Sequence, residues 1–194
     1  MKPQQAIDHI LSRLEKDLPE TLYYHGRHHA VDVLESAKMI AKSENVTLEE
    51  INLLLVAAAY HDCGFLNKYK NHEEESCKIA RGALPQFGFD DVSVVKVCEM
   101  IMATKVPQNP HSKLAEILCD ADLDYLGTDR FKRTGDLLYD ELIAIKAISD
   151  RKTWDHIQIK FLTAHRYYTK FSKENRQPTK ELHIRGLKKT LGLS

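Results

Sequence analysis

The chain has 194 residues and no net formal charge, because 28 Lys and Arg residues balance 28 Asp and Glu residues. Its 43% hydrophobic and 29% charged residues are ordinary for a water-soluble protein, and this length is enough for one domain with a substantial core. No run of 18 apolar residues predicts a membrane span, and the polar N-terminal segment has no apolar signal core. The four scattered cysteines show no C-x-x-C spacing, so we expect reduced, buried thiols in a cytoplasmic protein.

The charge is unevenly distributed along the chain. Residues 150–194 contain 11 Lys and Arg residues and 4 Asp and Glu residues, a net charge of +7, and residues 1–149 carry the compensating −7. Either the basic C-terminal region docks on the acidic remainder, or part of it faces an anionic substrate or partner.

Two helices are predicted before residue 45. Residues 3–18 place apolar side chains at helical spacing, and the segment from about 27 to 42 repeats this pattern with His29 on its apolar face. His25 stands four residues before His29, and Asp32 stands three after it. If the helix reaches back to His25, all three lie on its core-facing side.

The next helix leads to a histidine–aspartate pair. Thr47 opens a capping box, and the apolar run 53–59 predicts a buried helix that ends at His61 and Asp62. We expect Gly64 to end this helix in the left-handed conformation. A buried imidazole and carboxylate need polar partners, and a divalent metal ion satisfies both, although a simple helix-capping pair is the alternative.

The rest of the chain is also predicted to be helical. Asn71 is expected to cap a helix that begins at His72. Further helices are expected from about 91 to 105, 112 to 127, 128 to 149, 152 to 170 and 178 to 191. No β-type alternation lasts more than four residues, so the sequence predicts an all-α bundle.

Three predicted helices carry potential metal ligands. These are His29, the pair His61 and Asp62, and one carboxylate of the cluster from Asp120 to Asp124. Helical cores build metal sites in this way, from side chains on facing helices.

The ordered set His29, His61-Asp62 and Asp122 resembles the HD superfamily of metal-dependent phosphohydrolases. Residues 24–33 are similar to the first metal motif of class I cyclic-nucleotide phosphodiesterases. Residues 71–76, 103–105 and 120–127 look like a group of small bacterial predicted HD phosphohydrolases. The resemblance covers about residues 20–130 of an expected single HD-type domain, 1–194, and leaves the basic helices of 131–194 outside it. The phosphodiesterases usually have asparagine at the position of Gly26, and their large substrate-binding region has no counterpart here, so cyclic-nucleotide specificity does not follow.

The resemblance implies roles for particular residues. It implies that His29, His61, Asp62 and Asp122 bind a divalent ion, with Mn, Mg, Fe, Ni, Co and Zn not distinguished, and that His25 donates a proton to the leaving group. Asp120 is an alternative metal ligand or a support, and Asp32 is expected to support the ligands from behind. His72 and Glu73 are expected to bind a second ion or to position water. Arg27 and Lys105 are expected to bind phosphate. The ordinary alternative for the last four is a solvated surface position.

The function predicted from these residues is metal-dependent hydrolysis of a phosphoester, in a nucleotide or another small phosphorylated metabolite, with Asp62 and His25 taking part in catalysis. The alternative is a non-catalytic HD module that binds metal or nucleotide and signals to a partner. A helical nucleic-acid-binding protein is disfavoured by the zero net charge and the absence of a recognition motif. The oligomeric state stays open, a homo-oligomer included.

Overall fold

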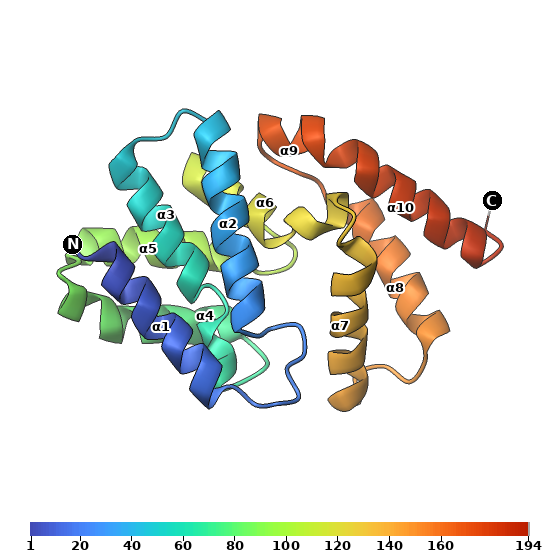
Figure 1. Ribbon diagram of the computed structural model, residues 1–194, viewed down its shortest axis with the longest axis horizontal. Coiled ribbons are helices and arrows are strands. Elements are labelled where there is room, and N and C mark those ends of the chain that lie inside the picture. The colour runs from blue at the N-terminus through green and yellow to red at the C-terminus, as the bar shows by residue number, and fades with distance from the viewer. Residues whose placement is uncertain (194) are drawn as a thin grey trace.

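The computed structural model describes residues 1–193, and within this range the chain forms ten α-helices and no β-strand (Figure 1). The all-α prediction is therefore confirmed. The helices are α1 (Pro3–Asp17), α2 (Arg27–Ser43), α3 (Leu48–Tyr60), α4 (His72–Ala83), α5 (Asp91–Ala103), α6 (Lys113–Asp122), α7 (Phe131–Ala144), α8 (Arg151–Ala164), α9 (Lys170–Asn175) and α10 (Gln177–Thr190). None of these described helices is long and apolar enough to cross a membrane.

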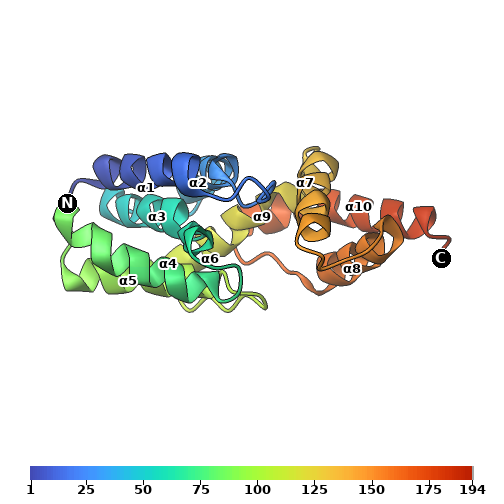
Figure 2. The ribbon, with the colours of Figure 1, turned by 90° about the horizontal axis from the view of Figure 1, so that it is seen from below.

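Helix α3 is the centre of the first group of helices. In Figure 2, α1 and α2 form one layer, α4 and α5 form the opposite layer, and α3 lies between them. Helix α3 can occupy this place because its segment 53–59 is apolar on all sides, and Leu54, Val56, Ala57 and Ala58 have no exposed surface. The buried pair that follows α3 is thereby held at the middle of the bundle.

The C-terminal helices α7, α8 and α10 form a second group beside the first, and the two chain ends lie at opposite ends of the molecule (Figure 1). A separate apolar cluster of Leu123, Leu126, Phe131 and Leu162 joins the end of α6 to these helices. That residues 1–194 form one domain stays a prediction.

The prediction of three helices after Gly127 is wrong, because the described chain has four there. The helix expected from 152 to 170 stops at Ala164, and α9 follows after a non-helical segment. Buried Asp120 explains the break. Its carboxylate accepts the backbone N–H groups of Tyr168 at 2.9 Å and Thr169 at 2.8 Å, and also the Thr169 hydroxyl at 2.7 Å.

Some predicted helix ends are confirmed and others are wrong. Thr47 forms the predicted capping box with Glu50. Asn71 precedes α4, but it adopts a left-handed φ of 55° and its side chain caps nothing. Gly64 is not left-handed; it lies in the 3-10 turn Cys63–Leu66, where a Cβ atom would come within 2.0 Å of the His72 carbonyl oxygen. Glycine is therefore needed there for the close approach of α4.

Candidate metal centre

Four side chains from three parts of the fold converge on one point. His29 comes from the first turn of α2, His61 and Asp62 follow α3, and Asp122 is the last residue of α6. The two imidazole Nε2 atoms are 3.3 Å apart. Asp122 Oδ1 lies 3.1 Å from His29 Nε2 and 3.4 Å from His61 Nε2, and Asp62 Oδ2 lies 3.4 Å and 3.2 Å from the same two atoms.

This donor set fits a divalent ion. The His61 Nδ1 atom lies 2.8 Å from the Ala58 carbonyl oxygen, which can only accept, so Nδ1 carries a proton and Nε2, which faces the cluster, is the nitrogen that can bind an ion once it is deprotonated. Ligand atoms bound about 2.0–2.2 Å from one ion lie roughly 3.0–3.5 Å apart when they are neighbours in tetrahedral or octahedral geometry, and each carboxylate oxygen has this spacing to both imidazole nitrogens. His29, His61 and Asp122 in particular each offer one ligand atom within 4.8 Å of the others.

The two carboxylates stabilise positive charge at this point. Burial lowers the pKa of the His61 imidazole, but neighbouring Asp62 and Asp122 outweigh it and raise that pKa well above its usual value. Burial raises the pKa of the Asp122 carboxyl, but the hydrogen bonds from His29 and His61 outweigh it and lower the pKa to about 2. Both carboxylates are therefore ionised near neutral pH.

His25 lies beside the cluster without belonging to it. Helix α2 begins at Arg27, so His25 precedes the helix, and its ring centroid lies 6.2 Å from that of His29. Asp32 does not join them on the core-facing side, as its side chain is 45% exposed and pairs with Arg130 at 3.1 Å. The three residues therefore do not share one helix face: the condition that the helix reach back to His25 is not met, and Asp32 is turned outward.

A residue that the sequence did not indicate, Glu141 of α7, holds His25 in place. Its side chain is fully buried, and Oε1 lies 2.5 Å from His25 Nδ1 and 3.1 Å from the Tyr69 hydroxyl. Its other oxygen accepts the backbone N–H groups of Tyr24 at 2.9 Å and His25 at 3.1 Å. Because an ionised carboxylate can only accept, His25 donates from Nδ1, and its Nε2 is the ring nitrogen left for other chemistry.

Phe65 links His25 to a second histidine. The phenyl ring stacks on His25 and on His72, with ring centroids 4.1 Å apart in each case. His72 Nε2 lies 3.3 Å from Asp62 Oδ1 and 3.5 Å from Glu73 Oε1. The two oxygens of Asp62 thus face different groups, one the His29–His61 pair and the other His72.

Three other residues singled out from the sequence have different surroundings. Arg27 pairs with Glu15 at 3.2 Å, and Lys105 pairs with Glu74 at 2.5 Å, both at the surface. Asp120 is fully buried and faces the C-terminal segment instead of the cluster. No local signal in the sequence shows whether Arg27, Lys105 and Asp120 have a functional role or an ordinary surface or structural one.

A cavity of about 290 Å³ opens at the cluster. Its polar end is formed by His25, Asp62, His72, Glu73 and Asp122. Its other walls come from η3 (Asp124–Gly127), α7 and α8 and are mainly apolar, with the polar side chain of Gln158 among them. The arrangement can therefore place a small molecule against the candidate metal ligands and His25 together.

Comparisons with known proteins agree with this geometry. The HD domain pattern matches residues 26–124, more than half of the chain. A predicted HD superfamily hydrolase from an uncultured Thermotogales bacterium is 21% identical, with a TM-score of 0.64 over 97% of this chain and 91% of that one. A Lactobacillus plantarum protein is 16% identical, with a TM-score of 0.67 over 99% of both chains. Bacillus subtilis YpgQ, solved with ADP, is 20% identical, with a TM-score of 0.63 over 98% of this chain and 97% of that one. These structures are similar in fold, and no protein of curated function matches. The chain belongs to the HD domain family.

Proposed function

We propose that this chain is a metal-dependent phosphohydrolase that cleaves a phosphoester of a nucleotide or another small phosphorylated metabolite. The observation that carries the proposal is the convergence of four side chains beside a cavity that His25 also lines, with Asp62 Oδ2 and Asp122 Oδ1 each 3.1–3.4 Å from the His29 and His61 Nε2 atoms. That YpgQ was solved with ADP supports a nucleotide as the substrate.

In this proposal His29, His61, Asp62 and Asp122 hold the divalent ion. When bound, such an ion polarises a phosphoryl oxygen and lowers the pKa of a water molecule. Asp62 takes part directly in catalysis, because its Oδ1 faces His72 and the cavity and can orient the attacking water. His72 and Glu73 either help to position this water or bind a second ion, since both line the cavity next to Asp62.

His25 donates the proton to the departing oxygen. Glu141 fixes Nδ1–H, so only Nε2 is left to release a proton into the cavity. His25 does not belong to the group of converging ligand atoms, but it lines the same cavity, which supports a role as a proton donor to a substrate bound there. Arg27 and Lys105 are not part of the proposal, because both pair with glutamates and neither lines the cavity.

The test begins with metal analysis of the purified protein. The protein is then loaded separately with each of the six candidate ions, and phosphate release is measured over a panel of nucleotides and sugar phosphates. We expect release with at least one ion, and its loss on addition of a chelator. Bound metal without phosphate release from any compound would contradict the proposed activity and favour the non-catalytic binding module.

A further inference from the structure

The cavity at the candidate metal centre has two ends of opposite character. One end contains the carboxylates and imidazoles of the cluster, and the other is lined by Leu138 and Leu142 of α7 and by Trp154, Ile157, Phe161 and Leu162 of α8. A ligand that fills it must therefore be amphipathic, with a charged group at the cluster and an apolar body against α7 and α8. The volume of about 290 Å³ lies at the lower limit for small-molecule sites, which favours a compact body such as one ring system.

Trp154 is the second feature that indicates a ligand. It is only 5% exposed and lines the cavity, and its indole N–H has no hydrogen-bond acceptor among the described residues. A buried donor without a partner costs about 1–3 kcal/mol, so an acceptor atom on the ligand would offset this cost. The apolar body is therefore expected to carry a carbonyl oxygen or a ring nitrogen.

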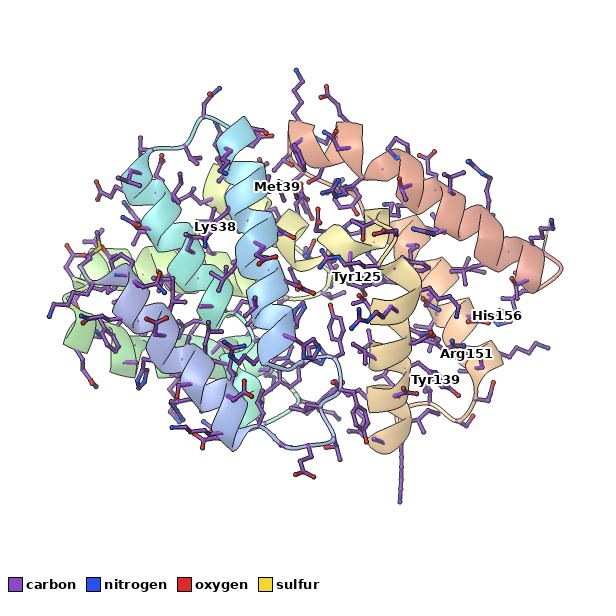
Figure 3. The ribbon with its side chains drawn as sticks, viewed as in Figure 1. Lys38, Met39, Tyr125, Tyr139, Arg151 and His156 are labelled. Carbon is purple, nitrogen blue, oxygen red and sulfur yellow. The ribbon has the colours of Figure 1, made fainter. Side chains whose placement is uncertain are left out.

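The walls of the cavity are built before any ligand binds. Arg151 of α8 lies over the Tyr139 ring of α7 at 4.6 Å and also pairs with Asp136, as Figure 3 shows for the labelled Arg151 and Tyr139. At Gly135 of α7, a Cβ atom would lie only 3.1 Å from the Gln158 side chain of α8. These side-chain contacts link the two helices on either side of the cavity, which reduces the ordering cost of binding.

The few positive charges around the cavity limit how much negative charge a bound ligand can carry. Among the described residues that line the cavity, none is lysine or arginine. Arg130 and Arg133 line a different cavity of about 530 Å³, which adjoins the cluster at His29, and Tyr24 lines both cavities. A di- or triphosphate needs several cationic side chains to balance its charge, whereas the divalent ion that the cluster would hold can balance much of the charge of one phosphoryl group.

From these observations we propose that the substrate is a phosphomonoester with an apolar, flat organic part that binds between α7 and α8 and accepts a hydrogen bond from Trp154. The inference rests on the proposed phosphohydrolase function and narrows its substrate class. It predicts discrimination against polyphosphates.

The single tryptophan of the chain gives a direct binding assay. Non-hydrolysable probes are titrated into the metal-loaded protein while the Trp154 emission is recorded. The probes are benzylphosphonate, methylphosphonate and methylenediphosphonate. We expect benzylphosphonate to change the emission and to bind roughly 10–100-fold more tightly than methylphosphonate, from the burial of one phenyl ring. We expect methylenediphosphonate to gain nothing over methylphosphonate.

Three variants test where the probes bind. Ile157 lines the cavity but is 42% exposed, so the Ile157→Gln variant should fold normally. It should weaken the binding of benzylphosphonate and leave the affinity for methylphosphonate unchanged. Arg133→Gln is the matched control in the neighbouring cavity and should leave all three affinities unchanged. For the Trp154→Phe variant, binding is measured by calorimetry. This substitution should weaken the binding of phenacylphosphonate, which has a carbonyl acceptor, more than the binding of benzylphosphonate.

The outcomes separate this inference from the proposed function. Tightest binding of methylenediphosphonate, lost in Arg133→Gln, would overturn the inference and identify a polyphosphate site. Hydrolysis of nucleoside triphosphates without benzylphosphonate binding would also overturn it and leave the proposed function standing. The expected order of affinities without hydrolysis of any phosphomonoester would support the ligand class and contradict the proposed activity.

Discussion

Replacement of Glu141 by glutamine is expected to disable His25 without touching the metal ligands. The glutamine oxygen can still accept the backbone N–H groups of Tyr24 and His25, and its NH₂ group then faces His25 Nδ1, which lies 2.5 Å from the native carboxylate. Nδ1 must therefore become an acceptor, so the imidazole carries its proton on Nε2 in the neutral form. The protonated form, which donates to the leaving group, loses its anionic partner.

The size of the effect follows from the contacts of Glu141. General-acid catalysis contributes about 10²–10⁴-fold, which sets the upper limit, and we expect a loss of roughly 10²-fold in turnover. A lost hydrogen bond to a charged group costs about 1.5–3 kcal/mol, which corresponds to a fall of about 3–12 °C in melting temperature for a chain of this size.

The stability difference should depend on pH. Burial raises the pKa of the Glu141 carboxyl, but the hydrogen bonds from His25 and from the two backbone N–H groups outweigh it and hold that pKa below its usual value of 4.5. A depressed carboxyl pKa stabilises the native state above the pKa of the unfolded chain, and this stabilisation is lost as pH falls through the lower, folded value. The difference in melting temperature between native protein and variant should therefore be largest near neutral pH and shrink below about pH 4.5.

The assay compares an alkyl phosphomonoester with a nitrophenyl phosphomonoester, whose leaving group needs little protonation. The loss in Glu141→Gln should be large for the first and small for the second, with an unchanged metal content. Tyr69→Phe is the matched control, because it removes one hydrogen bond to Glu141 Oε1 and keeps the carboxylate. Turnover of the alkyl substrate at the native rate in Glu141→Gln would refute the reasoning and leave Glu141 a purely structural residue.

Three further substitutions test separate parts of the site. Asp62→Ala should abolish tight metal binding and lower the melting temperature of the metal-loaded protein, as measured by metal analysis and calorimetry; an unchanged metal content would exclude Asp62 as a ligand. His25→Ala should keep the metal and lose roughly 10²–10⁴-fold in turnover of an alkyl substrate, whereas loss of the metal would make His25 a ligand instead. Gly64→Ala should destabilise the fold by about 1–3 kcal/mol or more in urea unfolding, because its Cβ would lie 2.0 Å from the His72 carbonyl oxygen. Gly82→Ala is its control: no atom lies within 4 Å of the added Cβ in helix α4, so equal destabilisation there would contradict the steric argument.

The first six helices could be predicted because their signals are local. Thr47 and Ser112 cap helices through contacts within three residues, and the apolar run before His61 is continuous in the sequence. The C-terminal helices were harder to delimit because the break before α9 depends on Asp120, which is 48 residues away from its partner Tyr168. A short-range pattern contains no information about such a contact.

The same distinction explains which site residues the sequence indicated. His61 and Asp62 stand out because a buried helix ends in two adjacent polar residues. Glu141 follows Asp140 in an amphipathic helix, where two acidic residues normally indicate a solvated face, and its partner His25 is 116 residues away. Trp154 likewise reads as an ordinary core residue, since only the structure reveals that its N–H lacks an acceptor.

The candidate metal ligands and the residues that line the rest of the cavity come from different groups of helices. His29, His61 and Asp122 are fixed by α2, α3 and α6, which pack closely against one another. Glu141, which positions His25, and the apolar wall with Trp154 come from α7 and α8. If the proposed function holds, substitutions in α7 and α8 can change substrate choice and proton transfer while metal affinity stays constant. A chain with this arrangement can therefore alter its specificity without rebuilding the buried core that holds the ion.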